Sequence, residues 1–185
     1  MLNTRIDLDE FLAVALAPEN ADRRLQRIDG EIVEVVSNNQ SSEIGFTIGS
    51  ELYSFVRPRK LGRVTGSDGG YTILGEQYIP DCAFVSHQRQ PQTTTEAYPE
   101  VAPDVVVEVL SPSNTASGDE RDRLSRKVAN YLAAGCELWL VYPDEKKLER
   151  YVAGEPVQTY RSGDTLPGRG LLEGFRLDIA SVWPA

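Results

Sequence analysis

The chain of 185 residues has a mass of 20.5 kDa, and 41% of its residues are hydrophobic, so we expect one globular domain with a substantial core. Its formal net charge of −9 argues against a broad basic surface for nucleic acid, although it is compatible with a local basic groove. No apolar run approaches the roughly 18 residues of a membrane span, so no membrane partner is expected.

The N-terminal segment and the cysteines indicate the compartment. Residues 1–20 are acidic and amphipathic and do not show the basic and apolar regions of a signal peptide. Cys82 and Cys136 both lie beside apolar residues, and we expect buried free thiols in a reducing, cytoplasmic environment. Together with the single histidine, His87, they do not have the spacing of a zinc site.

Hydrophobic spacing predicts the elements of the first part of the chain. Apolar residues at helical spacing predict a short amphipathic helix within residues 7–16 and a second helix from about 41 to 56, which Pro58 ends. Between these helices, residues 24–36 alternate around Asp29 and Gly30, which is a typical β-hairpin signal.

Short strands dominate the remainder. They are expected at residues 62–66, 71–74, 78–86, 104–110 and 136–143. A polar loop precedes the fourth of these strands, and a helix that begins near Ser117 and ends before Gly135 precedes the fifth. The pattern predicts one α/β domain, residues 1–185, with a central mixed sheet, an N-terminal β-hairpin and a β-rich C-terminal tail.

A charged residue interrupts the apolar strand in "PDVVVEVLSPSN", residues 103–114. Strand alternation places Asp104, Val106 and Glu108 on one face. A lone carboxylate in a sheet core costs several kcal/mol unless it is paired. At about 3.3 Å per residue, Asp104 is roughly 13 Å from Glu108, so a close partner for Glu108 must come from elsewhere in the fold.

Asp81, in "IPDCAFVS", is the first candidate partner. Like Asp104, it follows a proline and opens an apolar strand. If the two strands are neighbours, Asp81 and Glu108 converge, and a divalent cation would remove the repulsion between their carboxylates. Oxygen ligands of this kind suit Mg²⁺ or Mn²⁺.

Lys127 is the second candidate partner. It lies three residues after Leu124 and four before Tyr131, so it flanks the apolar face of its predicted helix and its ammonium can reach the sheet. A metal-bound pair of carboxylates beside one lysine suits phosphodiester hydrolysis. The metal would activate water, and the lysine would orient that water or stabilise the developing negative charge.

A third carboxylate could come from the predicted hairpin. Glu31 and Glu34 fall on opposite faces of its second strand because their spacing is odd. Only one of them can point inward, and Glu31 is the candidate.

Each of these residues also has a purely structural interpretation. Glu108 could form an ion pair inside the domain, Asp81 could cap a turn, and Asp104 could begin its strand. Lys127 could be an ordinary surface lysine. His87 is expected in a loop, so the sequence offers little support for a Ser-His-Asp triad.

An ordered set of motifs extends across most of the chain: "IDGEIVEV", "IPDCAFVS", "APDVVVEVLSPSN" and "RDRLSRKVANYLAAGCELWLVYPDEKKLERY". This set resembles the Uma-type family of restriction endonucleases, which is common in cyanobacteria. The resemblance implies the restriction-endonuclease-like fold of the PD-(D/E)xK superfamily, in which helices flank the central mixed sheet.

The resemblance also implies roles for individual residues. Asp81 matches the Pro-Asp of the superfamily pattern, and Glu108 matches the acid of the acid-x-Lys part. Leu110 stands where that pattern has lysine, and the resemblance implies that the lysine has moved to the following helix, as Lys127. Asp104, which also follows a proline, remains the second choice of metal ligand.

Three functional hypotheses follow. The first is a Mg²⁺- or Mn²⁺-dependent DNA endonuclease, which would act as a homodimer if it cuts both strands. The second is a non-catalytic binding or regulatory protein that retains the nuclease fold, which the acidic charge and the missing acid-x-Lys lysine favour. The third is a metal-dependent hydrolase that acts on a substrate other than DNA.

Overall fold

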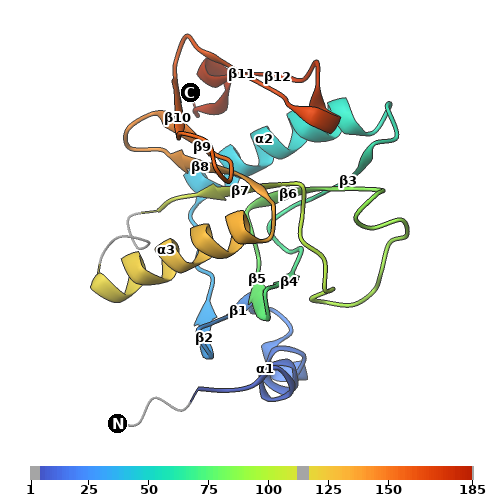
Figure 1. Cartoon of the computed structure of the whole chain (residues 1–185). Coiled ribbons are helices and arrows are strands. Elements are labelled where there is room, and N and C mark those ends of the chain that lie inside the picture. The colour runs from blue at the N-terminus through green and yellow to red at the C-terminus, as the bar shows by residue number, and fades with distance from the viewer. Residues whose placement is uncertain (1–4, 112–116, 185) are drawn as a thin grey trace.

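A six-stranded mixed sheet forms the centre of the computed structural model, which describes residues 5–111 and 117–184 (Figure 1). The strand order is β10-β9-β8-β7-β6-β3. The strands are β3 (Gly62–Thr65), β6 (Cys82–Ser86), β7 (Val105–Val109), β8 (Glu137–Tyr142), β9 (Lys147–Tyr151) and β10 (Gln158–Arg161). The β7–β8 pair is parallel and the other neighbours are antiparallel, so the predicted mixed sheet is confirmed.

Two helices cover the opposite faces of this sheet (Figure 1). On one face, α2 (Asn39–Val56) buries Ile48 and Leu52 against the odd-numbered valines of β7, together with β11 (Thr165–Pro167) and β12 (Arg176–Asp178) of the C-terminal tail. On the other face, α3 (Gly118–Ala133) buries Tyr131 against Val106. The alternation of β7 therefore decides which of its residues meet α3, and Glu108 shares the face of Val106.

A smaller sheet packs at the α3 side of the molecule, in the order β2-β1-β5-β4 (Figure 1). Its strands are β1 (Leu25–Ile28), β2 (Glu31–Glu34), β4 (Tyr71–Ile73) and β5 (Glu76–Tyr78), and α1 (Leu8–Ala15) precedes them. The predicted hairpin is confirmed, since Asp29 and Gly30 have φ values of 52° and 76° at the β1–β2 turn. Positive φ at both positions is typical of the two-residue hairpin turn.

The segment 78–86 was predicted as one strand, and this prediction is wrong. The chain leaves β5 at Tyr78 and enters β6 at Cys82, and these two strands belong to different sheets. Pro80 explains the break, because proline donates no ladder hydrogen bond and restricts the residue before it. The break places Asp81 at the entrance of β6, where the two sheets meet.

Two glycines bring α2 close to this entrance. A Cβ atom on Gly45 would lie 3.3 Å from Cβ of Asp81, and one on Gly49 would lie 3.2 Å from Sγ of Cys82. Larger residues at these two positions would push the helix away from β6. The glycines therefore keep Asp81 directly beneath α2.

The ends of α3 match their sequence signals. Ser117 caps the helix by accepting a 3.1 Å hydrogen bond from the backbone N–H of Glu120. Gly135 has a φ of 75° just after the helix, in the left-handed conformation that glycine adopts most readily. Cys82 and Cys136 are buried free thiols, as predicted. Within the described residues, the helices fall short of the length and apolar character that a membrane crossing requires.

Candidate active site

Asp81 and Glu108 lie on adjacent antiparallel strands. The β6–β7 register pairs Cys82 with Val107, so Asp81, which immediately precedes β6, lies beside the end of β7 that carries Glu108. The backbone N–H of Val109 donates a 2.7 Å hydrogen bond to Oδ2 of Asp81, which holds this carboxylate across the pair.

Lys127 reaches the same place from α3. Its Nζ lies 2.7 Å from Oε1 of Glu108, and the side chains of these residues are only 11% and 12% exposed. The ammonium also lies 5.7 Å from the centroid of the Tyr78 ring. One cavity of about 390 Å³ is lined by Asp81, Glu108 and Lys127. The fold therefore brings together the three residues that were predicted from the sequence.

Tyr131 adds a contact that the sequence did not suggest. Its hydroxyl donates a 2.7 Å hydrogen bond to Oε1 of Glu108, the same oxygen that Lys127 contacts. Burial and the charge of Glu108 keep the pKa of Tyr131 well above its ordinary value, so the hydroxyl stays a donor at neutral pH. Among the described side chains, both donors of Glu108 converge on Oε1, and Oε2 is the oxygen able to turn toward a cation.

The electrostatics of Asp81 favour a bound cation. Burial, and then the negative charge of Glu108, raise the pKa of Asp81 to about 6, although the Val109 amide and Lys127 oppose the shift. A carboxyl group with this pKa is ionised at neutral pH, although burial and the nearby negative charge make its ionised form less stable than usual. A divalent cation between Asp81 and Glu108 would relieve both the burial and the repulsion.

The donor set fits a hard cation with a partly hydrated shell. Within residues 5–111 and 117–184, no group of three or more His, Cys, Asp or Glu side chains has an arrangement that could enclose a metal ion. Mg²⁺ does not need such an enclosure, because it commonly binds one or two carboxylates and completes its shell with water and substrate phosphate. Asp81 and Oε2 of Glu108 fit this mode of binding.

The other two predicted carboxylates lie elsewhere. Asp104 accepts a 2.6 Å hydrogen bond from the N–H of Ser86 and lies 3.2 Å from the Nε atom of Arg89, so it holds a turn at the opposite end of β7. Glu31 forms a 2.7 Å ion pair with Arg123 and lines a different cavity. The structure therefore separates both residues from Asp81 and Glu108.

Two carboxylates and one amide side chain of the cavity were not predicted. Glu34, not Glu31, lines it, and its carboxylate is a half-exposed partner of Arg23 at 2.7 Å. Gln26 and Glu120 line it as well. Only one of the two hairpin glutamates lines this cavity, as their odd spacing predicted, but it is Glu34 and not the expected Glu31. Which one lines it depends on how the hairpin packs on the large sheet.

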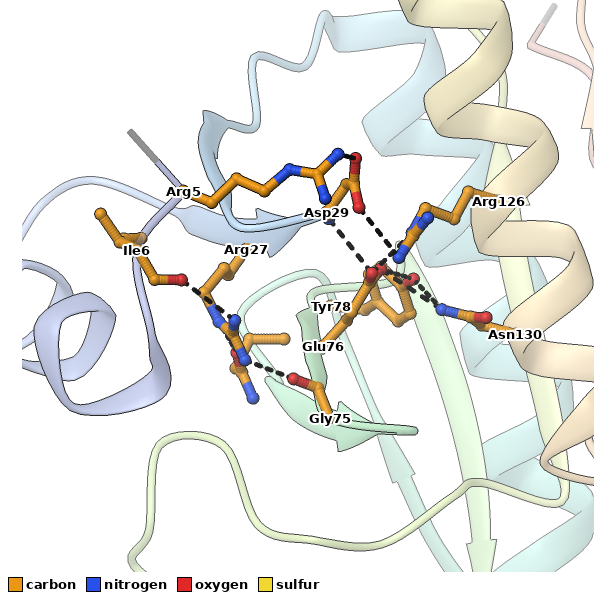
Figure 2. A network of polar contacts seen from close by, with 10 residues as sticks. Arg5, Ile6, Arg27, Asp29, Gly75, Glu76, Tyr78, Arg126 and Asn130 are labelled. Atoms are coloured by element: carbon orange, nitrogen blue, oxygen red, sulfur yellow. Dashed lines mark hydrogen bonds and ion pairs between the residues drawn. The ribbon is translucent and has the colours of Figure 1, made fainter. Parts of the chain in front are cut away.

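A polar network centred on the buried Glu76 joins the small sheet to α3 (Figure 2). Arg126 and Asn130 flank Lys127, and both donate to the buried carboxylate of Glu76, at 2.6 Å and 3.3 Å. Figure 2 shows Glu76 also accepting from the hydroxyl of Tyr78 and from the backbone N–H of Asp29. The small sheet thereby sets the height and rotation at which Lys127 meets Glu108.

Comparisons with known proteins identify the family and the fold. A family model named Uma2 and described as "Putative restriction endonuclease" matches residues 8–180. A crystal structure described as "a putative nuclease belonging to DUF820 from Anabaena variabilis ATCC 29413" superposes with a TM-score of 0.80, at 22% identity, and covers 96% of this chain and 97% of that chain. No curated protein matches significantly. The predicted restriction-endonuclease-like fold is confirmed.

Proposed function

The chain belongs to the Uma2 family, and on that premise we propose that it is a metal-dependent DNA endonuclease with Asp81, Glu108 and Lys127 at its centre. The observation that carries the proposal is the convergence of these side chains. Two carboxylates on neighbouring strands and one ammonium from a helix line the same cavity. This set matches the acids and the lysine that phosphodiester hydrolysis requires.

The position of the lysine supports a migrated superfamily pattern. Leu110 occupies the place where the pattern has lysine, and it is 9% exposed. Lys127 instead contacts Glu108 directly, at 2.7 Å. On this proposal, an ammonium delivered by α3 would take the position beside the acid that a lysine on β7 takes in the superfamily pattern.

Asp81 and Glu108 are the residues that would hold Mg²⁺ or Mn²⁺. When bound, such an ion would supply activation of a water molecule and neutralisation of phosphate charge. Val109 holds Asp81 through its N–H, and Tyr131 holds Glu108 through its hydroxyl. Lys127 would orient the attacking water or stabilise the charge that develops on the phosphate oxygens.

The substrate that best suits this site is DNA. Family membership and the nuclease-like fold support a phosphodiester substrate. Cutting both strands of a duplex would require two such sites, so we propose a homodimer for that activity.

Incubation of the full chain with plasmid and short duplexes in Mg²⁺ or Mn²⁺ tests the proposal. We expect cleavage by the wild type and its loss in Glu108→Gln and Lys127→Ala. Asp104→Asn is the matched control for Asp81→Asn, because both aspartates follow a proline but only Asp81 lines the cavity. Cleavage that persists in the Glu108 and Lys127 variants would refute the site. A wild type that neither cuts varied DNAs nor binds metal in calorimetry would favour the non-catalytic alternative.

A further inference from the structure

A groove beside the candidate active site has no part in the hydrolysis proposed above. It has a volume of about 460 Å³ and lies between α2 and β3, with Tyr53 and Val64 among its lining residues. Asp81, Ser37 and Ser41 line both this groove and the cavity that holds Glu108 and Lys127. The groove is therefore continuous with the position of the proposed chemistry.

Two exposed aromatic side chains of α2 line the groove. Phe46 is 77% exposed and Tyr53 is 44% exposed. They are seven residues apart, so they lie on the same face of the helix, separated by about 10 Å along its axis. Aromatic rings presented in this way are sequence-tolerant platforms for nucleobases.

Positive charges lie on the turn just beyond Tyr53, near one end of the groove but outside its lining residues. α2 and β3 form the two walls of the groove, and a short turn joins them. This turn contains Arg57, Arg59 and Lys60, all of them exposed. Among the ion pairs of the described residues, none involves these three cations. Arg57 donates a hydrogen bond to the hydroxyl of Tyr53, which links this cation to the aromatic wall. Arg59 instead lies 3.8 Å from the ring centroid of Phe55, which is not part of the groove lining.

This concentration of cations is unusual in a chain with a net charge of −9. Three of the four residues from 57 to 60 are basic, and acidic partners do not neutralise them. Cations that are left unpaired at the mouth of a groove suit an anionic ligand such as a phosphate. Asp68 and Asp81 line the groove as well and would repel a phosphate near them, so the phosphate is best placed at the Arg57 end.

We propose that this groove binds an unpaired segment of the DNA strand next to the bond that is cut. Bases would stack on Phe46 and Tyr53, and a backbone phosphate would contact Arg57 and Lys60. About 18 Å of helix separates Gly45, which lies over Asp81, from Arg57, so a short stretch of single strand can connect the two ends. This inference rests on the proposed function, and it predicts a preference for DNA with a gap, flap or single-stranded tail.

Binding of labelled single-stranded and duplex oligonucleotides, measured by fluorescence anisotropy in EDTA, tests the groove apart from cleavage. The full chain carrying Glu108→Gln serves as the background, because it removes one carboxylate charge and keeps strands intact. We expect tighter binding of the single strand than of the duplex. Phe46→Ala should weaken single-strand binding roughly 5- to 150-fold, the range expected for the loss of one stacked base.

Lys60 has a closely matched control. Lys60 and Lys146 are both exposed turn lysines with positive φ, at 54° and 46°, and neither takes part in an ion pair among the described residues. Asparagine tolerates this conformation. Lys60→Asn should lower the slope of log affinity against log salt by about 0.7, the value for one phosphate contact of a single strand. Lys146→Asn should leave the slope unchanged.

Leu16→Ala is the control for Phe46→Ala, because Leu16 is 60% exposed at the end of a different helix. Equal loss of affinity in both variants, or none in Phe46→Ala, would overturn the proposal. A change in oligomeric state by light scattering, with DNA affinity intact, would show that the groove binds a second copy of the chain and would also overturn it. If binding meets these expectations but the wild type does not cleave DNA in Mg²⁺, the endonuclease proposal is refuted and the groove proposal is still supported.

Discussion

Nζ of Lys127 and Oε1 of Glu108 lie 2.7 Å apart across the boundary between α3 and β7, and both side chains are nearly buried. Removing one member of a buried ion pair leaves an uncompensated charge, which typically costs 3–5 kcal/mol. The same contact therefore links the stability of the fold to the chemistry proposed for it, and the two effects have to be separated by experiment.

The first prediction concerns this ion pair. Lys127→Met should lower kcat by on the order of 10²–10³-fold, the usual loss when one donor to the transition state is removed. It should also reduce the free energy of unfolding by a few kcal/mol. Adding Glu108→Gln to Lys127→Met should recover part of that stability, because neither member of the ion pair then carries a charge, while cleavage does not recover. Urea unfolding of both variants at pH 7.5 measures the recovery; strictly additive losses would contradict it.

The second prediction concerns the pH dependence of stability. Asp81 has its pKa raised from 3.8 to about 6 in the folded chain. Between these values the folded state binds more protons than the unfolded state, so Asp81 makes stability fall as pH rises through this window. Asp81→Asn removes the effect. In EDTA at pH 7.5 the variant should be more stable than the wild type by roughly 2–3 kcal/mol, since one pKa unit is worth about 1.4 kcal/mol.

Denaturant unfolding from pH 4 to pH 7.5 tests this second prediction. The difference between Asp81→Asn and the wild type should be near zero at the acidic end and should reach its full value above pH 6. A difference that is constant across the range would show that Asp81 does not titrate as proposed.

The third prediction concerns metal binding. Mg²⁺ or Mn²⁺ should raise the Tm of the wild type, and saturation to 100 times Kd corresponds to about 2.7 kcal/mol of stabilisation. The shift should disappear in Glu108→Gln. Below pH 6 the affinity should fall about tenfold per pH unit, because one proton must leave Asp81 before the cation binds. A metal-induced shift of the same size in Glu108→Gln would move the site away from these carboxylates.

The fourth prediction concerns Tyr131. Tyr131→Phe keeps the buried ring but removes the hydrogen bond to Glu108, and a bond to a charged group is worth about 1.5–3 kcal/mol. We expect a loss of stability of this order and a lower kcat with an unchanged metal affinity, since Oε2 of Glu108 is untouched. Tyr98→Phe is the control, because its hydroxyl donates at 2.6 Å to the carbonyl of Leu25, away from the cavity. Equal kcat in Tyr131→Phe and the wild type would exclude a positioning role.

The fifth prediction tests whether the lysine can return to its usual place. Leu110 lies two residues after Glu108, and strand alternation therefore places it on the same side of β7. Leu110→Lys added to Lys127→Ala should restore part of the lost cleavage, because the ammonium can again reach Glu108. Leu110→Met in the same background has a similar length without the charge and should restore none.

Sequence reasoning predicted the elements and their class because alternation and helical spacing are local signals. The hairpin at Asp29 and Gly30 and the cap at Ser117 depend only on neighbouring residues. The break at Pro80 was missed because the apolar run continues across it, and only the packing of two sheets shows that Tyr78 and Cys82 part there.

For the candidate site, the residues were predictable from the sequence but their arrangement in space was not. Asp81, Glu108 and Lys127 could be nominated from motif and spacing, but their convergence depends on the β6–β7 register and on the docking of α3. Tyr131 was assigned to the apolar face of α3, and it does lie there. Its hydroxyl lies opposite Glu108 only because of the depth at which α3 packs, and no pattern in the sequence encodes that depth.

The ion pair between Lys127 and Glu108 also sets the sign of the field that a DNA strand would meet. Two carboxylates and one ammonium give the cluster of Asp81, Glu108 and Lys127 a formal net charge of one negative unit. Glu34 and Glu120, which also line the cavity, are paired with Arg23 and Arg123. A divalent ion would reverse the charge of the cluster to one net positive. A bound cation would thus attract the DNA phosphate in addition to supplying activation of water. Binding of the strand near the scissile bond should therefore strengthen with divalent-ion concentration even in a variant that cannot cut.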